Sequence, residues 1–528
     1  MSLQDKFTYP LQLSTVSVPL ALISCNVLLN WVYRNPMLLV CSTTVTIALI
    51  AVVHYLLDIY YAGWVPQTYK GYRTPPGPEF RPIVGQFITH FLQPNLHEML
   101  KDEREKYGNV HSVQFGQTAG YMVHTRDLTK QLFDDAKNSK VVLRTDFQDT
   151  RYAFGRDKDI LISNLEPWKV NRKGFTIAMA AVHKAMGGHL AYLSKIAEEE
   201  AISVRMRVSG GKPFVVSEEF IETTFNILVR TLVGRLATPE EKAVIVQLQS
   251  EFPRPCLAEI FHKIPECIID KLFDNRHQQV KVMVDSINAI LDDWIAQPTG
   301  KQCLIALLKE DDTIEEISLR GMVMNMFVAG YDSVKYHMTW YLHLITMYPK
   351  VQQRLQYLLY HDEKEYLVYF NQVYREVMRY RPIMLSGIWY KTTEDVILND
   401  KDQKYIIPAK SYAFYNTYQI HHNTEFWDDP EKFRPSRFKK DGGVSDEDYA
   451  VNYVGFFLGK RRCLGEKMAV DEIKTVITEL LRHHSFVSDI PLNDDTFVQT
   501  IMAQKPFHLR AVEKNIVDTL CSIEEADQ

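Results

Sequence analysis

The sequence predicts a mainly α-helical protein with minor β sheets and an apolar N-terminal segment ahead of the folded body. Hydrophobic residues make up 46% and charged residues 24% of the 528 positions, the balance of a globular chain with a large core. Most apolar positions repeat at helical spacing, whereas residues 110–115 and 404–407 alternate as strands do. The net charge of -5 leaves no basic excess, so we expect no nucleic-acid partner.

The N-terminal region holds an uncharged stretch long enough to cross a bilayer. Residues 37–57 carry no formal charge and contain only His54 as a weakly basic group. A helix over them would measure about 30 Å, the thickness of the hydrocarbon core. A buried core helix is the alternative, but it would need protein on all sides, and a turn-rich stretch begins at Gly63. The sequence therefore predicts a transmembrane helix here.

A second uncharged run covers residues 16–33, but Pro19, Asn26 and Asn30 interrupt it. Three interpretations stay open for this run: a second span, an interfacial helix, or a segment packed beside the first span. Basic residues follow the longer stretch closely, which by the positive-inside tendency places the remainder on the cytoplasmic side of the membrane. These residues are Lys70, Arg73 and Arg81.

Two Pro/Gly clusters, residues 75–78 and 82–85, predict a stiff connection between this segment and the rest of the chain. Beyond them there is no repeat, low-complexity tract or Gly/Ser linker. We therefore assign residues 1–62 to a membrane anchor and residues 63–528 to one domain. The seven cysteines form no CxxC pair, which favours a reducing compartment and single-residue roles for any cysteine that matters.

One long helix is predicted in the second half of the chain. Thr313 and Glu316 have the spacing of a capping box, and no proline follows until Pro349, which leaves room for about 30 helical residues. Residues 322–330 are apolar on nearly every face except at Asn325. We therefore expect this helix to run through the body and not over its surface.

The most specific motif is the segment from Phe456 to Gly465, which reads FFLGKRRCLG. Its Cys463 stands ahead of an apolar helical run, where backbone N–H groups and a helix N-terminus can hold a thiolate. Such a cysteine can bind a metal. The alternatives are a buried structural cysteine in a glycine turn and a phosphate-binding loop, although the Walker order of residues is absent.

This segment resembles the haem-binding loop of the cytochrome P450 family. All five fixed positions of the pattern F-x-x-G-x-R-x-C-x-G match, and residues 433–438 match the family segment F-x-P-x-R-F. Glu376, Arg379 and Pro382 match its E-x-x-R-x-x-P helix. The resemblance covers the chain beyond the N-terminal segment. It implies the cytochrome P450 fold with an N-terminal transmembrane anchor, of the eukaryotic microsomal type and, by general likeness, of fungal origin.

Glu376 and Arg379 lie three residues apart on one predicted helix face and can pair, and Arg437 can join them. Alone, such a pair is usually an exposed bridge worth a few tenths of a kcal/mol. The apolar neighbours and the family match favour a buried network behind the cysteine loop. We expect its role to be structural.

The resemblance also implies which residues contact the haem. Cys463 would be the axial ligand of the iron. Trp168 and Arg172, four residues apart, match a W-x-x-x-R pair that donates to a haem propionate, because a guanidinium makes charge-assisted hydrogen bonds to a carboxylate. Tyr390 occupies a position where the family commonly carries a propionate-binding arginine, so a phenol replaces a positive charge. The loop residues Phe456, Gly459 and Arg461 complete the set.

The long helix contains the expected oxygen site. Residues 329–333 resemble the family stretch A-G-x-[DE]-T, in which the acid and the hydroxyl relay protons; here these are Asp332 and Ser333. Ser333 replaces the usual threonine and keeps the hydroxyl but not the methyl group, which puts efficient coupling in doubt. By family position, the substrate pocket would be lined by apolar residues that would also suit a plain core: Phe327, Ala329, Leu385, Ile501 and Met502.

Together these features imply a haem b enzyme that inserts one atom of O2 into a lipophilic small molecule by hydroxylation or epoxidation, in secondary metabolism. The chain has no GxGxxG fingerprint for its own nicotinamide or flavin, so electrons would come from NADPH through a separate membrane-bound reductase docking near residues 460–462. Cytochrome b5 is a second candidate donor. The expected location is the endoplasmic reticulum membrane, with the catalytic domain in the cytoplasm.

Two alternatives belong to other functional classes. A haem-thiolate isomerase or dehydratase would need no electrons, and the serine at position 333 is consistent with one. A non-catalytic haem sensor would have no evident use for an Asp332–Ser333 pair. Consumption of NADPH with a reductase present distinguishes the isomerase from a monooxygenase, and formation of a product distinguishes both from the sensor.

Overall fold

The computed structural model describes residues 36–61, 63–83, 85–86, 96–134, 137–144, 160–184, 192–251, 263–272, 275–312, 314–385, 390–439, 452–492 and 507–513. The chain divides into two compact units, Met1–Tyr61 and Ala62–Gln528, and every described strand belongs to the second. The assignment of residues 1–62 to an anchor and of 63–528 to a catalytic domain stays a prediction.

The first unit contains helix α2, Pro36–Tyr60, over the stretch predicted to be transmembrane. Large apolar side chains along this helix are exposed, Leu49 by 59% and Leu56 by 57%. None of the helices in the described parts of the chain combines the length and the apolarity that a bilayer crossing needs. The helix is where the sequence placed it, but its crossing of a membrane is not supported. The second uncharged run, residues 16–33, lies outside the described residues.

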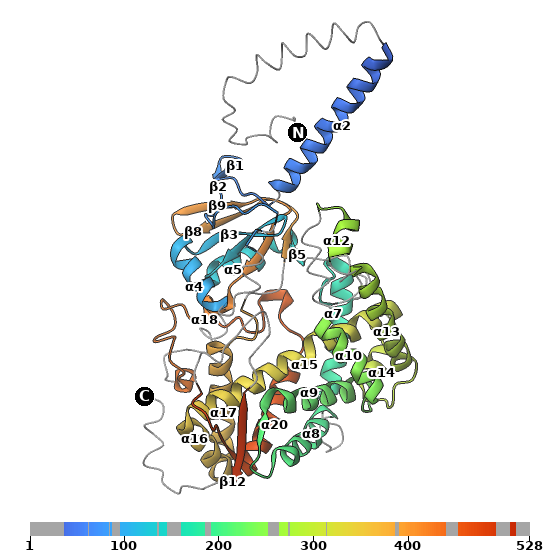
Figure 1. Ribbon diagram of the computed structural model, residues 1–528. Coiled ribbons are helices and arrows are strands. Elements are labelled where there is room, and N and C mark those ends of the chain that lie inside the picture. The colour runs from blue at the N-terminus through green and yellow to red at the C-terminus, as the bar shows by residue number, and fades with distance from the viewer. Residues whose placement is uncertain are drawn as a thin grey trace. The chain divides into compact units, whose positions relative to one another are not determined.

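The second unit is mainly helical, and the 32-residue α15, Glu316–Met347, runs among its other helices (Figure 1). Met322, Val323 and Met324 are at most 1% exposed, and the Asn325 side chain donates to the carbonyl of Gly321. The long, buried helix predicted from the sequence is confirmed. The helices packed against α15 are α9 (Val216–Val233), α13 (Arg276–Ala296), α14 (Leu304–Lys309), α16 (Pro349–His361), α17 (Glu363–Tyr380) and α20 (Glu466–His483).

The C-terminal end of α15 was predicted correctly from the sequence, whereas its N-terminal cap was not. Its C-terminal end comes before Pro349, as predicted, because that proline opens α16. At its start the N-cap is Glu315, whose side chain makes no capping bond, and Thr313 of the predicted capping box lies outside the described residues. In the middle, a Cβ at Gly330 would lie 3.2 Å from Leu228 of α9. This glycine therefore lets two helices approach closely.

The remaining helices of the second unit are all shorter than α15. Several of them carry residues discussed below. They are α4 (Leu96–Tyr107), α5 (Arg126–Phe133), α7 (Leu165–Val182), α8 (Tyr192–Val208), α10 (Pro239–Glu251), α12 (Glu266–Leu272), α18 (Thr417–His421) and the short 3-10 helices η2 (Asn138–Lys140), η4 (Pro435–Phe438) and η5 (Gly459–Arg461).

Three small sheets accompany the helices, with strand orders β1-β2-β9-β8, β3-β4-β10-β7-β5 and β11-β12-β6. The two strands predicted from alternation are confirmed as β3 and β9. The strands are β1 (Thr68–Tyr69), β2 (Tyr72–Arg73), β3 (Val110–Phe115), β4 (Thr118–Val123), β5 (Val142–Arg144), β6 (Pro213–Val215), β7 (Tyr390–Thr392), β8 (Val396–Asp400), β9 (Gln403–Ile407), β10 (Tyr412–Tyr415), β11 (His484–Val487) and β12 (His508–Glu513).

The five-stranded sheet joins segments from two distant parts of the chain. Strand β10 runs parallel to β4 and antiparallel to β7, and β5 continues the sheet by pairing with β7. In this register Arg144, the last residue of β5, lies opposite Tyr390, the first residue of β7. The sheet therefore places a residue from before α7 beside one from after α17.

Candidate active site

The cysteine loop is shaped by its own backbone. The N–H of Cys463 donates to the carbonyl of Phe456 at 2.9 Å, and the N–H of Val454 donates to Nε2 of His421 at 3.0 Å. Phe457 adopts a positive φ of 66° and Gly459 one of 58°, so the chain turns twice within the loop. These turns present Cys463 directly before α20.

Gly459 is required at its position for two reasons. Its positive φ favours glycine, and a Cβ there would overlap the carboxylate of Asp134, at the C-terminal end of α5. Any side chain there would therefore require the Asp134 carboxylate or the loop that carries Cys463 to shift. The loop match made Gly459 a cofactor-binding residue, and the structure gives it this packing role as well.

The surroundings of the Cys463 sulfur combine burial with donors that favour a thiolate. Burial raises the pKa of the Cys463 thiol, and the carboxylate of Glu466 acts in the same direction. The backbone N–H groups of Gly465 and Glu466 and the guanidinium of Arg172 act to lower it. A thiol bound to a metal ion loses its proton outright, because the charge of the ion inverts the effect of burial.

Helix α7 brings two predicted haem contacts to the same place as the loop. The guanidinium carbon of Arg172 lies 5.5 Å from the centroid of the Trp168 ring, and that of Arg461 lies 4.2 Å from it. Arg172 also donates to the carbonyl of Arg462 at 2.7 Å, and Arg461 donates to the side chain of Asn164 at 2.9 Å. We call Trp168, Arg172 and Arg461, together with Arg144, the Trp168 cluster.

Two buried members of the Trp168 cluster have donors that find no acceptor among the described residues. The indole Nε1 of Trp168 and the Nε and Nη1 of Arg144 have no hydrogen-bond partner. Trp168 is 9% and Arg144 5% exposed, so water does not replace the missing acceptors freely. Carboxylates are the acceptors that guanidinium and indole donors fit best. A thiolate donor beside a cluster of carboxylate-seeking donors suits haem, which carries an iron ion and two propionates.

Tyr390 lies in this region, as the family position implied. Its side chain is 5% exposed, and its ring lies 4.4 Å from the guanidinium carbon of Arg144 and 4.5 Å from the Phe133 ring. Arg144 was not among the residues predicted for the site. No short motif in the sequence marks it, because its importance comes from the pairing of β5 with β7.

Glu376, Arg379 and Arg437 lie together, and we call them the Glu376 cluster. Arg379 donates through Nε and Nη2 to the two oxygens of Glu376, each at 2.8 Å, and Arg437 Nε donates to Glu376 at 3.1 Å. All three side chains are at most 1% exposed. The geometry is that of a buried network and not of an exposed ion pair.

Backbone carbonyls complete the Glu376 cluster, which holds two cations and one anion. Arg379 donates to the carbonyls of His421 and Pro430 at 3.0 and 2.9 Å, and Arg437 donates to that of Asp428 at 2.8 Å. None of the buried nitrogen atoms of the two arginines lacks a partner. The chain itself therefore satisfies this cluster, and it needs no ligand.

The acid and the hydroxyl predicted for the oxygen site follow each other on α15 but bond to different groups. Ser333 donates to the carbonyl of Ala329 at 2.6 Å, one turn earlier. Asp332 accepts from Lys335 at 2.5 Å, and the Lys335 side chain is only 8% exposed. Lys335 was not among the residues predicted for the site, although its i,i+3 spacing from Asp332 is visible in the sequence. An ammonium group therefore competes for the carboxylate to which a proton-relay role was assigned.

The predicted substrate residues do not share one environment. Phe327 and Leu385 are fully buried, and the Phe327 ring packs against Trp294 of α13 at 5.4 Å. Ala329 is exposed and lies on the same face of α15 as Ser333. Ile501 and Met502 lie outside the described residues. The substrate-contact assignments stay predictions.

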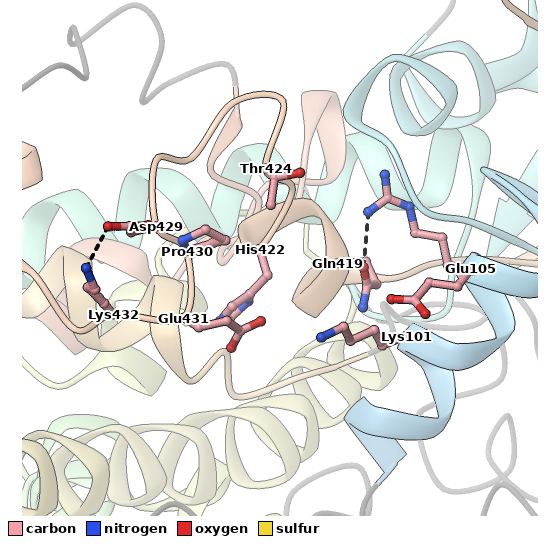
Figure 2. Close-up of a pocket in the computed structure, with 10 residues that line it drawn as sticks. Lys101, Glu105, Gln419, His422, Thr424, Asp429, Pro430, Glu431 and Lys432 are labelled. Carbon is pink, nitrogen blue, oxygen red and sulfur yellow. Dashed lines mark hydrogen bonds and ion pairs between the residues drawn. The ribbon is translucent and has the colours of Figure 1, made fainter.

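A surface cavity of about 410 Å³ lies between α4 and the chain around and after α18 (Figure 2). Its polar groups largely pair with one another: Lys432 bonds to Asp429 at 2.8 Å, and Arg104 donates to Gln419 at 3.1 Å. None of the residues predicted for the active site lines it. This cavity contributes nothing to the candidate site.

Comparisons with known proteins agree with this geometry. A family model described as Cytochrome P450 matches residues 75–511. Cytochrome P450 1A1 of Cavia porcellus is 25% identical over 465 residues, which covers 80% of this chain and 87% of that protein. Cytochrome P450 2J5 of Mus musculus is 24% identical over 450 residues, with 80% and 86% covered.

Solved structures show the same fold. A zebra fish cytochrome P450 structure with progesterone matches with a TM-score of 0.66 at 18% identity and covers 79% of this chain and 99% of that one. A second zebra fish structure, with abiraterone, gives a TM-score of 0.63 at 18% identity, with 79% and 100% covered. The family match spans most of the chain, including the cysteine loop. The chain belongs to the cytochrome P450 family of haem-thiolate monooxygenases, in which a cysteine thiolate binds the haem iron and a redox partner supplies electrons.

Proposed function

We propose that this protein inserts one atom of O2 into a lipophilic small molecule, by hydroxylation or epoxidation, in secondary metabolism. The observation that carries the proposal is the Cys463 loop facing the Trp168 cluster, a thiolate donor beside buried donors without acceptors. The apolar residues expected at the pocket support a lipophilic substrate. Bound haem would supply the oxidising power, because a thiolate ligand favours cleavage of the O–O bond.

The chain's own residues would bind the cofactor and manage protons. Cys463 would hold the iron, and Trp168, Arg172 and Arg461 would bind the propionates. The Ser333 hydroxyl, on the exposed face of α15 with Ala329, is the group best placed to hold and pass a proton. Asp332 would assist this proton transfer while paired with Lys335. The Ser333 hydroxyl would therefore carry most of the proton delivery.

The electron donor in this proposal is a separate NADPH-dependent reductase, with cytochrome b5 as a second donor. Lys460 is exposed in η5, within the cysteine loop, where a negatively charged partner could reach it. Arg462 is 43% exposed but is already paired with Glu466. The basic run therefore offers less free charge than the sequence suggested.

We further propose that α2 attaches the protein to the endoplasmic reticulum membrane, with the catalytic domain in the cytoplasm. The support is its exposed apolar side chains, which water would not favour. Deleting residues 1–62 should release the protein from membranes without changing its haem spectra. Tight membrane binding by the shortened chain would show that other surfaces attach it.

The proposed activity is tested by comparing metabolites of cells with and without the protein, followed by turnover of the differing compound with purified reductase. We expect an oxygenated product, formed only with NADPH and O2 and labelled by 18O from labelled O2. Ser333→Ala should then lower the product yield per NADPH, and Ser333→Thr should preserve or raise it. Conversion without NADPH would identify a haem-thiolate isomerase or dehydratase instead, and the absence of any product would leave a sensor.

A further inference from the structure

The surface cavity between α4 and the chain around α18 is lined by one buried side chain with an unused hydrogen-bonding atom. This residue, His422, is 6% exposed, and its Nε2 has no hydrogen-bond partner among the described residues. Its Nδ1 lies 2.9 Å from the carbonyl oxygen of Tyr418, which can only accept, so Nδ1 carries the proton. The Nε2 atom is therefore an acceptor, and a buried acceptor without a donor is costly.

The ring of His422 is held in place and stays neutral. It stacks on Tyr418 with 3.9 Å between the ring centroids, and its centroid lies 6.1 Å from that of Tyr380. Burial, followed by the charges of Arg379 and Arg381, holds the pKa of His422 well below its usual range. A protonated ring would turn Nε2 into a donor, so the low pKa keeps this atom an acceptor.

Two carboxylates on opposite walls of the cavity also have unused acceptor capacity. Glu105 comes from α4 and Glu431 from the segment after α18, and both are exposed (Figure 2). Neither forms an ion pair with a described residue. Among the described residues Glu431 accepts only from the hydroxyl of Tyr418, at the long distance of 3.5 Å. Because Tyr418 also stacks on His422, the Glu431 carboxylate and the His422 ring lie in the same part of the cavity.

Most of the cations around the cavity already have partners. Lys432 bonds to Asp429 at 2.8 Å, and Arg104 donates to Gln419 at 3.1 Å. Lys101 is exposed and forms no ion pair with a described residue. The open acceptors of the cavity therefore outnumber its open cations.

We propose that this cavity binds a small organic cation with a primary ammonium group. The N–H groups of the ligand would donate to Nε2 of His422 and to the carboxylates of Glu431 and Glu105. A volume of about 410 Å³ lies in the usual range for small-molecule sites. The site goes beyond the proposed monooxygenase function and does not depend on it, because none of the residues predicted for the active site lines the cavity.

The test uses the full-length, haem-loaded protein, reduced and bound to carbon monoxide, so that an amine cannot reach the iron. Histidine labelled with 13C at Cε1 reports on His422 by NMR, and its signal is assigned by its loss in His422→Phe. Propylammonium and tetramethylammonium have the same charge and similar size, but only the first has N–H donors. Propylammonium should shift the His422 signal saturably, and tetramethylammonium should need at least about tenfold higher concentrations.

Three variants distinguish this site from a general attraction of cations to the surface. Glu431→Gln should weaken propylammonium binding by about threefold to tenfold. Lys101→Met should strengthen it, because a competing positive charge is removed. Asp102→Asn is the matched control, since it removes an exposed carboxylate of α4 that does not line the cavity, and it should leave the affinity within about twofold of wild type.

The inference is overturned if the His422 signal does not respond to propylammonium, or if tetramethylammonium binds equally well. Equal affinities for Glu431→Gln and the Asp102→Asn control would also overturn it. Inorganic phosphate is the opposing probe. If phosphate shifts the His422 signal in the wild type but not in Lys101→Met, and displaces propylammonium, the cavity selects anions and the inference fails.

Discussion

The Glu376 cluster and the Trp168 cluster both bury arginines, but they compensate the charges differently. In the first, a carboxylate and backbone carbonyls satisfy both guanidinium groups, and no buried donor is left over. In the second, Trp168 and Arg144 keep buried donors without acceptors. The chain satisfies the Glu376 cluster by itself, whereas the Trp168 cluster keeps donors that a bound anion can satisfy.

Cys463→His should have the largest effect, because it removes the proposed ligand without touching either cluster. Reduced, carbon monoxide-bound protein should lose its thiolate-type Soret band entirely. The loop should persist, since Cys463 is held through its backbone N–H. Cys267→Ser, at an exposed free cysteine, is the control and should keep the band. An unchanged spectrum for Cys463→His would rule out this residue as the ligand.

Glu376→Gln should destabilise the protein by disrupting the Glu376 cluster. It leaves two fully buried guanidinium groups without their carboxylate, which should lower the free energy of unfolding by about 3–5 kcal/mol. Chemical denaturation of the haem-loaded protein measures this loss. Glu466→Gln removes a partly exposed partner of Arg462 and should cost under about 1 kcal/mol. Equal losses for the two variants would show that the Glu376 cluster is not special.

Asp332→Asn tests whether the Asp332–Lys335 ion pair on α15 depends on its carboxylate, as the Glu376 cluster does. The substitution leaves the buried ammonium of Lys335 without its charged partner, so it should lower the free energy of unfolding by about 1–3 kcal/mol. Adding Lys335→Met should recover most of that loss, because both partners are then neutral. The free energies of unfolding of Asp332→Asn, Lys335→Met and the double variant, each relative to the unaltered protein, give the coupling energy. Strict additivity would mean that Asp332 and Lys335 do not depend on each other.

Acid should weaken the protein through two buried histidines, one of which adjoins the Glu376 cluster. Burial lowers the pKa of His337 and of His421 to about 3, against 6.5 for an unperturbed histidine. Below about pH 6.5 the unfolded chain therefore binds more protons than the folded one. Stability should be full above that pH and should fall by about 1.4 kcal/mol per pH unit for each such histidine. Thermal midpoints between pH 7.5 and 5.0 measure this, and a flat profile would contradict it.

Much of the helical architecture was readable from local sequence, whereas the sheet partners were not. The uninterrupted apolar pattern up to Pro349 predicted α15, and alternation predicted β3 and β9. Each of these patterns consists of residues that are close to one another in the sequence. The pairing of β5 with β7 depends on chain segments far apart, so no local pattern could reveal that Arg144 faces Tyr390.

The site shows the same division between local and distant information. The cysteine loop and the Glu376 cluster were recognisable because each motif has a fixed short spacing. The Lys335 partner of Asp332 has such a spacing too. A lysine on a predicted helix usually lies in solvent, however, and only the 8% exposure of the Lys335 side chain shows that the pair is buried. The environment of Phe327 against Trp294 could not be foreseen, because α13 approaches from outside the motif.

The five-stranded sheet also sets an order of events during synthesis. Its strands β3, β4 and β5 are made before α7, but β7 and β10 appear only after α17. Pairings between distant segments close more slowly than local helices, because a long loop must first be brought together. The helices made before β7 are therefore expected to condense while this sheet is still open. Haem uptake should accordingly wait until the ribosome has released β7, β10 and the Cys463 loop, so that the cofactor enters a chain in which these earlier helices are already folded.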